Sequence, residues 1–208
     1  MAFFKHLRVV LKHKHYVYKY ARKLGIPFIG FFHDMSKFSY TEFHLSSKYF
    51  SGKRSPTTIE RMDNDNWSNI CVHHVGRNKH HWHYWVDYLK DGIIVREIPF
   101  KHAVEYACDI MSASRVYAPK EFSYMVVYDY FKRHSERYLM HPQSKEFILW
   151  IVDSVDKIGF KETKKLLKTK YQELHDKYGS VTILLPFKEM NLSYLNIKEE
   201  KEVNNNEN

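Results

Sequence analysis

The chain has 208 residues, of which 44% are hydrophobic and 16% aromatic, so it is long enough to bury a substantial core in one domain, with or without an appendage. Its 7 glycines and 6 prolines are too few for a typical all-β protein. The formal net charge of +9 favours anionic partners such as nucleotides, phosphorylated metabolites or nucleic acid.

Cysteine use and hydropathy indicate the compartment. Cys71 and Cys108 show neither CxxC nor zinc-finger spacing, which fits a reducing environment. The opening residues, MAFFKHLRVVLKHKH, carry basic residues that interrupt any signal-peptide core. No apolar run approaches the ~18 residues of a membrane span. We therefore expect a soluble, cytoplasmic protein with no membrane partner.

The first predicted helix covers residues 3–24 and ends at Gly25, because apolar residues such as Val10 and Val17 recur at helical spacing. His13 lies on this apolar stripe and is therefore a better inward-facing ligand than His15. A buried histidine that bonds a backbone carbonyl is the alternative interpretation of His13.

The next predicted helix, residues 28–38, carries His33, Asp34 and Lys37. Ser39 has the position of an N-cap for residues 41–50, with Glu42 completing a capping box. Pro56 opens a helix that is predicted to run to His74 and to stop at Gly76.

The remaining pattern is also mostly helical. Pro99 precedes the clearest of these helices, residues 100–117, whose small and apolar residues suit close packing. Residues 180–187 are predicted to form a strand or an extended segment, and residues 198–208 to be disordered. The other predicted helices are residues 77–92, 142–158 and 161–178. Residues 121–140 are predicted to form a helix, or a helix plus a loop, over the site.

Adjacent His33 and Asp34 can ligate one hard divalent cation, since imidazole and carboxylate suit Fe, Mn, Zn or Mg. Lys37 follows His33 by four residues, so on a helix it would face an anion held by that cation. His13 and Asp109 would complete the ligand set from two other helices. A cation would also explain a carboxylate among apolar residues, although an Arg or Lys is the commoner partner.

A histidine-rich stretch, residues 73–81, adds further candidates. His74 and His81 would hold a second metal ion or move a proton. Which of the four histidines in this stretch face the site stays open, and a solvated basic loop is the alternative. The other candidates are Glu105 for catalysis and, for phosphate binding, Lys37, Arg77, Asn78 and Lys79.

The order H…HD…D resembles that of the HD-domain metal-dependent phosphohydrolases, which include nucleotidases and cyclic-nucleotide phosphodiesterases. The resemblance implies an HD-domain-like helical bundle in which the four positions bind the metal, here His13, His33, Asp34 and Asp109. HDMSK also resembles the HDxGK form of a dinuclear cyclic-dinucleotide branch, but Ser36 replaces the glycine and no GYP motif follows, so that activity is not implied.

A longer resemblance, over about residues 10–150, is to a family of small bacterial and phage proteins described as a domain of unknown function. It rests on HDxSKxSxxEF at residues 33–43, HHxGRNxHHxxYW at residues 73–85, and ExxCD at residues 105–109. His83 stands where a glutamate is expected, which would alter the metal or one step of a reaction.

These observations predict an all-α protein with three parts: an HD-like metal-binding helical domain (residues 1–158), a C-terminal helical extension packed on it (159–197) and a disordered tail (198–208). The expected function is that of a metal-dependent phosphohydrolase with one or two divalent ions and a small phosphorylated substrate, a nucleotide in the first instance. The alternatives are an HD-type diiron oxygenase and a non-catalytic, metal-stabilised module that binds nucleic acid.

Overall fold

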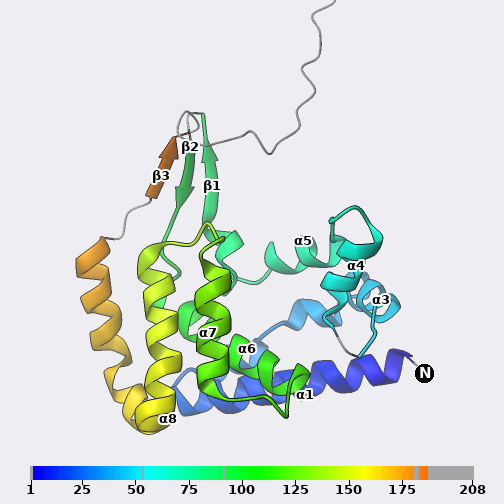
Figure 1. The fold of residues 1–208 in the computed structure, drawn as a ribbon, viewed down its shortest axis with the longest axis horizontal. Coiled ribbons are helices and arrows are strands. Elements are labelled where there is room, and N and C mark those ends of the chain that lie inside the picture. Colours follow the sequence, from blue (N-terminus) through cyan, green and yellow to red (C-terminus); the bar gives the residue numbers. More distant parts are fainter. Residues whose placement is uncertain (1, 53, 91, 180–182, 187–208) are drawn as a thin grey trace, which may run out of the picture.

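The structure is a computed structural model that describes residues 2–52, 54–90, 92–179 and 183–186. Helices dominate these residues, so the predicted all-α helical bundle is confirmed, with a small sheet added to it (Figure 1). The α-helices are α1 (Ala2–Lys23), α2 (Pro27–Phe32), α3 (Tyr40–Lys48), α4 (Pro56–Asp63), α5 (Asn69–Val75), α6 (Phe100–Tyr117), α7 (Tyr124–Ser135) and α8 (Pro142–Tyr178). Two short 3-10 helices are η1 (Met35–Phe38) and η2 (Trp82–Trp85).

The core lies where α1, α6 and the first half of α8 pack together. The predicted apolar stripe of α1 is buried there, with Val17 and Ala21 fully covered. Small residues of α6, such as Ala103 and Ala107, let the helices approach closely, as their spacing predicted. The aromatic and aliphatic side chains of α8, led by Phe147, fill the space between them.

The turn between α1 and α2 sets the position of the HD pair. Gly25 takes a φ of +88°, which ends α1 where the sequence predicted. Helix α2 then folds back onto α1 so closely that a Cβ added at Gly30 would collide with Ala21. This close approach brings the residues after α2 next to His13.

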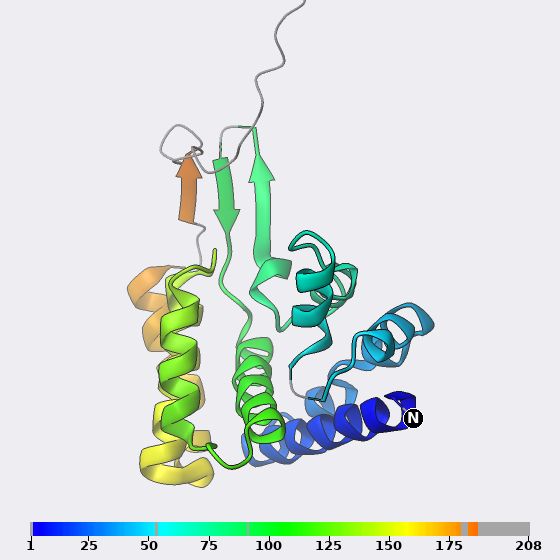
Figure 2. The same ribbon diagram turned by 45° about the vertical axis from the view of Figure 1, so that its right-hand side comes forward.

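Helix α3 packs on α1, and α4 and α5 pack on α3 and on each other above the N-terminal half of α1 (Figure 2). The expected helix from Pro56 to His74 is wrong: α4 ends at Asp63, and Asp65 and Asn66 take positive φ values of 45° and 65°. Ser68 then caps α5 by accepting a bond from the Cys71 amide at 3.0 Å.

The expected helix over residues 77–92 is also wrong. After η2 the chain forms strand β1 (Val86–Leu89), which pairs antiparallel with β2 (Gly92–Val95). β-branched residues dominate β2 and favour a strand. Strand β3 (Ile183–Pro186) lies on the other side of β2, so the extended segment expected near residues 181–187 is confirmed there, although it extends the sheet rather than packing on the bundle.

The C-terminal helices follow the prediction closely. Helix α8 is interrupted at Gly159, whose φ is +74°, so it consists of the two helices expected on either side of that residue. The second half packs on the core through Leu167 and Leu174. Residues 121–140 form a helix and a loop, as one of the two alternatives predicted: α7 packs mainly against α8, and Tyr138 in the loop after α7 lines a cavity. The tail, residues 198–208, lies outside the described residues. Among the described helices, none has the length and apolar character that crossing a membrane requires.

Candidate metal centre

The HD pair lies at a break between two helices, not inside the single helix expected over residues 28–38. His33 follows α2 with extended backbone angles, and Asp34 takes left-handed angles (φ 53°, ψ 34°) before η1 begins. Lys14 closes the break by donating to the carbonyl oxygens of Phe31 and His33, at 2.6 and 2.9 Å. A left-handed aspartate costs about 1–3 kcal/mol and marks a constrained position.

The structure brings together the four predicted metal ligands from three segments of the chain. His13 Nε2 lies 3.0 Å from Asp109 Oδ1, and His33 Nε2 lies 3.1 Å from Asp34 Oδ2. One ligating atom from each of the four residues lies within 4.8 Å of all the others. These residues form the first ligand group.

A second ligand group adjoins the first and shares Asp34. Its other members are His74, His80 and His81, again with ligating atoms within 4.8 Å of one another. The nitrogens His74 Nε2 and His80 Nε2 lie 3.4 and 3.6 Å from Asp34 Oδ1. Asp34 therefore offers one oxygen to each group, and His80, which the sequence did not single out, joins His74 and His81.

Several buried polar atoms of the two groups have charged neighbours but make no hydrogen bond. Within the described part of the chain, six of the nine buried side-chain atoms without a hydrogen-bond partner belong to these groups: His13 Nε2, His33 Nε2, Asp34 Oδ1, Asp34 Oδ2, His80 Nε2 and His81 Nε2. Buried polar atoms are normally hydrogen-bonded, so such a cluster calls for an explanation. Imidazole and carboxylate donors that converge in this way fit one or two divalent cations.

Glu105, expected among the catalytic residues, does not line the pocket but supports both groups from behind. Its Oε1 lies 2.9 Å from His33 Nδ1 and 3.3 Å from His80 Nδ1, and its Oε2 lies 3.0 Å from His102 Nδ1. Bonds to Nδ1 direct each Nε2 toward the centre. Glu105 is therefore a positioning residue.

Glu42 supports the second group in the same way. The Ser39 hydroxyl caps α3 as predicted, but the Glu42 carboxylate accepts from His74 Nδ1 at 2.8 Å and from His73 Nδ1 at 3.2 Å instead of completing the capping box. Glu42 is 2% exposed, which is unusual for a glutamate. Sequence analysis expected only a capping role for it, and the one sequence signal for a further role is its place in the HDxSKxSxxEF motif.

Electrostatics keep most ligands in the form that binds cations. Burial lowers the pKa of His13 and of His81, so both imidazoles are neutral. Burial alone would raise the pKa of Asp109, but the neighbouring His13 and His33 lower it well below its usual value. Asp34 and hydrogen bonds overcome burial and raise the pKa of His33, so without a cation this imidazole carries the compensating charge.

Of the four predicted phosphate-binding residues, only Lys37 lines the cavity. Lys37 lines the pocket, with its Nζ 2.6 Å from Asp34 Oδ2. Arg77 and Lys79 are exposed and do not line it. Asn78 donates to Ser36 Oγ and to the His74 carbonyl, each at 2.8 Å, and so holds the loop in place.

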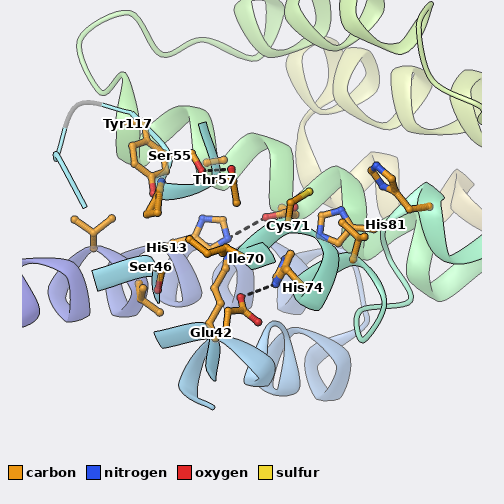
Figure 3. Close-up of a pocket in the computed structure, with 18 of the residues that line it drawn as sticks. His13, Glu42, Ser46, Ser55, Thr57, Ile70, Cys71, His74, His81 and Tyr117 are labelled. Atoms are coloured by element: carbon orange, nitrogen blue, oxygen red, sulfur yellow. Dashed lines mark hydrogen bonds and ion pairs between the residues drawn. The ribbon is translucent and has the colours of Figure 1, made fainter. Parts of the chain in front are cut away.

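The ligand groups open into a cavity of about 500 Å³, large enough for a nucleotide-sized molecule. Figure 3 shows His13 in its middle, His74 and His81 toward one end, and Ser46 toward the other. Arg61 lines the cavity and donates to Cys71 Sγ at 3.0 Å, without an ion pair to any described carboxylate. Arg61 was missed because it lies outside every histidine-rich motif.

Comparisons with known proteins give one finding. A family model described as a family of unknown function (DUF5662) matches residues 2–154, which include every member of both ligand groups. No curated protein and no solved structure matches the chain. The resemblance to the HD-domain phosphohydrolases therefore stays a prediction.

Proposed function

Because this chain belongs to the family of unknown function (DUF5662), we propose its function from the site alone: it is a metal-dependent phosphohydrolase that acts on a nucleotide or other small phosphate ester. One observation carries the proposal. Six buried atoms that make no hydrogen bond within the described residues converge in two ligand groups beside the ammonium of Lys37. Four residues of these groups, His13, Asp109, His74 and His81, line one cavity.

The two groups would hold two divalent cations, with Asp34 between them. His13, His33 and Asp109 would hold one cation, and the three histidines of the second group would hold the other. Bound Fe, Mn, Zn or Mg supplies Lewis acidity toward phosphate oxygens and makes water more acidic. No cysteine takes part, which suits an open catalytic site better than a closed structural zinc site.

Two cations of the chain would bind the substrate phosphate. Burial lowers the pKa of Lys37, but Asp34 and Asp109 outweigh it and raise that pKa, so the ammonium stays charged at neutral pH. Its bond to Asp34 places it beside the ligand groups. Arg61 adds a guanidinium, which suits phosphate oxygens because it offers a rigid fork of donors.

A neutral donor is available for the leaving group. Tyr117 lines the cavity near Lys37 and Asp109, and burial raises the pKa of its hydroxyl. The hydroxyl therefore keeps its proton at neutral pH and can donate a hydrogen bond to the departing oxygen. Of the two roles expected for His74 and His81, holding a second metal ion or moving a proton, cation binding is the better supported, because their ring nitrogens converge with an oxygen of Asp34.

Elemental analysis of the purified protein, with a phosphatase screen on the same samples, tests the proposal. We expect one or two equivalents of Fe, Mn or Zn and turnover of at least one phosphate ester. Asp34→Asn should lose both, because Asp34 belongs to both groups. Asp153→Asn, which changes an exposed ion pair with Lys157, is the matched control and should lose neither.

Failure to bind metal after reconstitution would refute the proposal. The histidines would then be structural, and a nucleic-acid-binding module would become the better interpretation of the net charge of +9. Iron content together with O₂ consumption and no phosphatase activity would instead identify a diiron oxygenase, which the histidine-rich donor set also suits.

A further inference from the structure

One more unpartnered buried atom faces the same cavity but belongs to neither ligand group. His6 is 4% exposed and lines the cavity, and its Nδ1 has no hydrogen-bond partner among the described residues. Its ring lies between those of Phe43 and Phe50, with centroid distances of 5.1 and 5.0 Å. Its Nε2 lies 2.9 Å from Ser46 Oγ, which fixes the ring orientation.

Helices α1 and α3 pack together along the cavity. We call the end at His74 and His81 the near end and the end at Ser46 the far end. On α1, His13 lies in the first ligand group, and His6 lies seven residues earlier, about 10 Å along the same helix face. On α3, Glu42 supports the near end, and Ser46 lies one turn further, beside His6. In Figure 3 Ser46 accordingly lies on the side of His13 away from His81.

The start of α4 lines the cavity as well and adds two hydroxyl groups. Ser55 Oγ and Thr57 Oγ1 lie 2.8 Å apart, and each keeps further capacity for hydrogen bonds. Val9 and Val10, which lie between His6 and His13 on α1, and Ile70 give the cavity wall an apolar part. We call the cavity wall formed by His6, Ser46, Ser55 and Thr57 the far arm.

The far arm contains hydrogen-bonding groups but no fixed charge. Burial, helped by the charge of Lys37, lowers the pKa of His6 to about 4, so its imidazole is neutral at physiological pH. Hydroxyls and a neutral imidazole each donate and accept hydrogen bonds, which suits an uncharged polar group.

We propose that the far arm is the subsite for an uncharged hydrogen-bonding group of the substrate, so that the substrate is a phosphate ester of a nucleoside-like alcohol. The phosphate would lie at the ligand groups, the middle of the molecule against the apolar residues, and a sugar hydroxyl or nucleobase edge at His6 and Thr57. This inference rests on the proposed function for the position of the phosphate, while the subsite itself is defined by the far arm.

Two kinetic probes and one binding probe test it on the full chain. Phenyl phosphate has the phosphate and an apolar ring only, whereas nucleoside 5′-monophosphates add the uncharged polar group. Nucleosides without phosphate report on the far arm alone, by calorimetric binding. The variants are His6→Phe, which keeps the ring volume, and Thr57→Val, which removes one hydroxyl. His15→Phe, an exposed histidine of the same helix, is the control.

We expect the Mn²⁺-loaded wild type to prefer a nucleotide to phenyl phosphate in kcat/KM. His6→Phe should lower kcat/KM for that nucleotide about tenfold, mainly through KM, because a net hydrogen bond is lost. The same variant should leave kcat/KM for phenyl phosphate within about twofold of the wild type. It should weaken nucleoside binding about tenfold, as it does kcat/KM for the nucleotide. Thr57→Val should act in the same direction, and the control should change nothing.

The outcomes separate this inference from the proposed function. Hydrolysis of phenyl phosphate with no nucleotide preference, or with equal losses for both substrates in His6→Phe, would refute the subsite and leave the hydrolase standing. No hydrolysis of any ester, but nucleoside binding that depends on His6, would refute the hydrolase and support the subsite. Absence of nucleoside binding together with absence of preference would overturn the subsite.

Discussion

Glu105 offers the sharpest test of how the two ligand groups are built. One carboxylate oxygen lies within hydrogen-bonding distance of His33 Nδ1 and His80 Nδ1, so a single residue orients one imidazole in each group. The hydrogen bonds from His102, His33 and His80 outweigh burial and lower the pKa of Glu105, so these bonds are charge-assisted. Glu105→Gln keeps the side-chain shape and removes the charge.

The magnitude follows from those two bonds. A hydrogen bond to a charged group contributes about 1.5–3 kcal/mol and a neutral one about 0.5–1.5 kcal/mol, so each histidine loses about 1 kcal/mol of orientation in the variant. Because His33 and His80 belong to different ligand groups, each cation should bind about fivefold more weakly at about 1.4 kcal/mol per tenfold. The two losses together amount to about 2 kcal/mol, or roughly 30-fold for the binding of both cations, which lies within the roughly 10- to 100-fold range typical of residues that orient metal ligands.

Titration of Zn²⁺ or Mn²⁺ against a chromophoric chelator measures the effect. Glu97→Gln is the matched control, since Glu97 pairs with His175 at 3.1 Å, away from the cavity. The control should bind metal as the wild type does. A change of less than about threefold in Glu105→Gln, or an equal loss in the control, would refute the assignment of Glu105 as a positioning residue.

Three further predictions test the substrate site, the fold and the protonation of the cavity. Arg61→Ala should raise KM for a phosphate ester about five- to tenfold, because it removes a charged donor from the cavity wall, whereas Arg77→Ala should leave KM within about twofold. Gly30→Ala should destabilise the fold by about 1–3 kcal/mol, since its Cβ would collide with α1, and thermal unfolding measures the loss. Burial lowers the pKa of His6 from 6.5 to about 4, so the unfolded chain binds a proton that the folded protein refuses. The wild type should therefore lose about 2 kcal/mol between pH 7 and pH 5 that His6→Phe retains, as seen in unfolding free energies across that range.

Each of these has a clear contrary result. A KM effect in Arg77→Ala that equals or exceeds the effect in Arg61→Ala would place the phosphate outside the cavity. An unchanged melting temperature in Gly30→Ala would mean that α1 and α2 separate at little cost. A parallel pH profile for the wild type and His6→Phe would show that His6 titrates in the folded protein as it does in the unfolded chain.

Local sequence signals predicted much of the helical framework, because each depends on only a few neighbouring residues. Gly25, at positive φ, ends α1, and Gly76 follows the last residue of α5. Pro56 is the first residue of α4, and Pro99 directly precedes α6. The same local reasoning failed at Asp34, where contacts from Lys14 hold a left-handed residue that periodicity does not reveal.

The hairpin and the second ligand group depended on contacts that no local pattern contains. Residues 86–95 form a strand pair that β3, almost 90 positions later in the chain, extends on its other side. His80 could not be preferred to His73 from helical spacing, because the chain between α5 and η2 is not helical. Tertiary structure distinguishes them, because His80 Nε2 lies 3.6 Å from Asp34 Oδ1, whereas His73 belongs to neither ligand group and pairs with Glu42.

The sequence by itself determined the chemistry that is available: the residue types that ligate hard cations, the basic balance, and a helical framework long enough to present them. Tertiary structure alone decided that His13, His33, Asp34 and Asp109 converge, that Asp34 serves two groups, and that Arg61 rather than Arg77 lines the cavity. The physical reason is that donor identity is a property of single side chains, whereas convergence depends on how α1, α2 and α6 pack and on which buried carboxylates orient each imidazole.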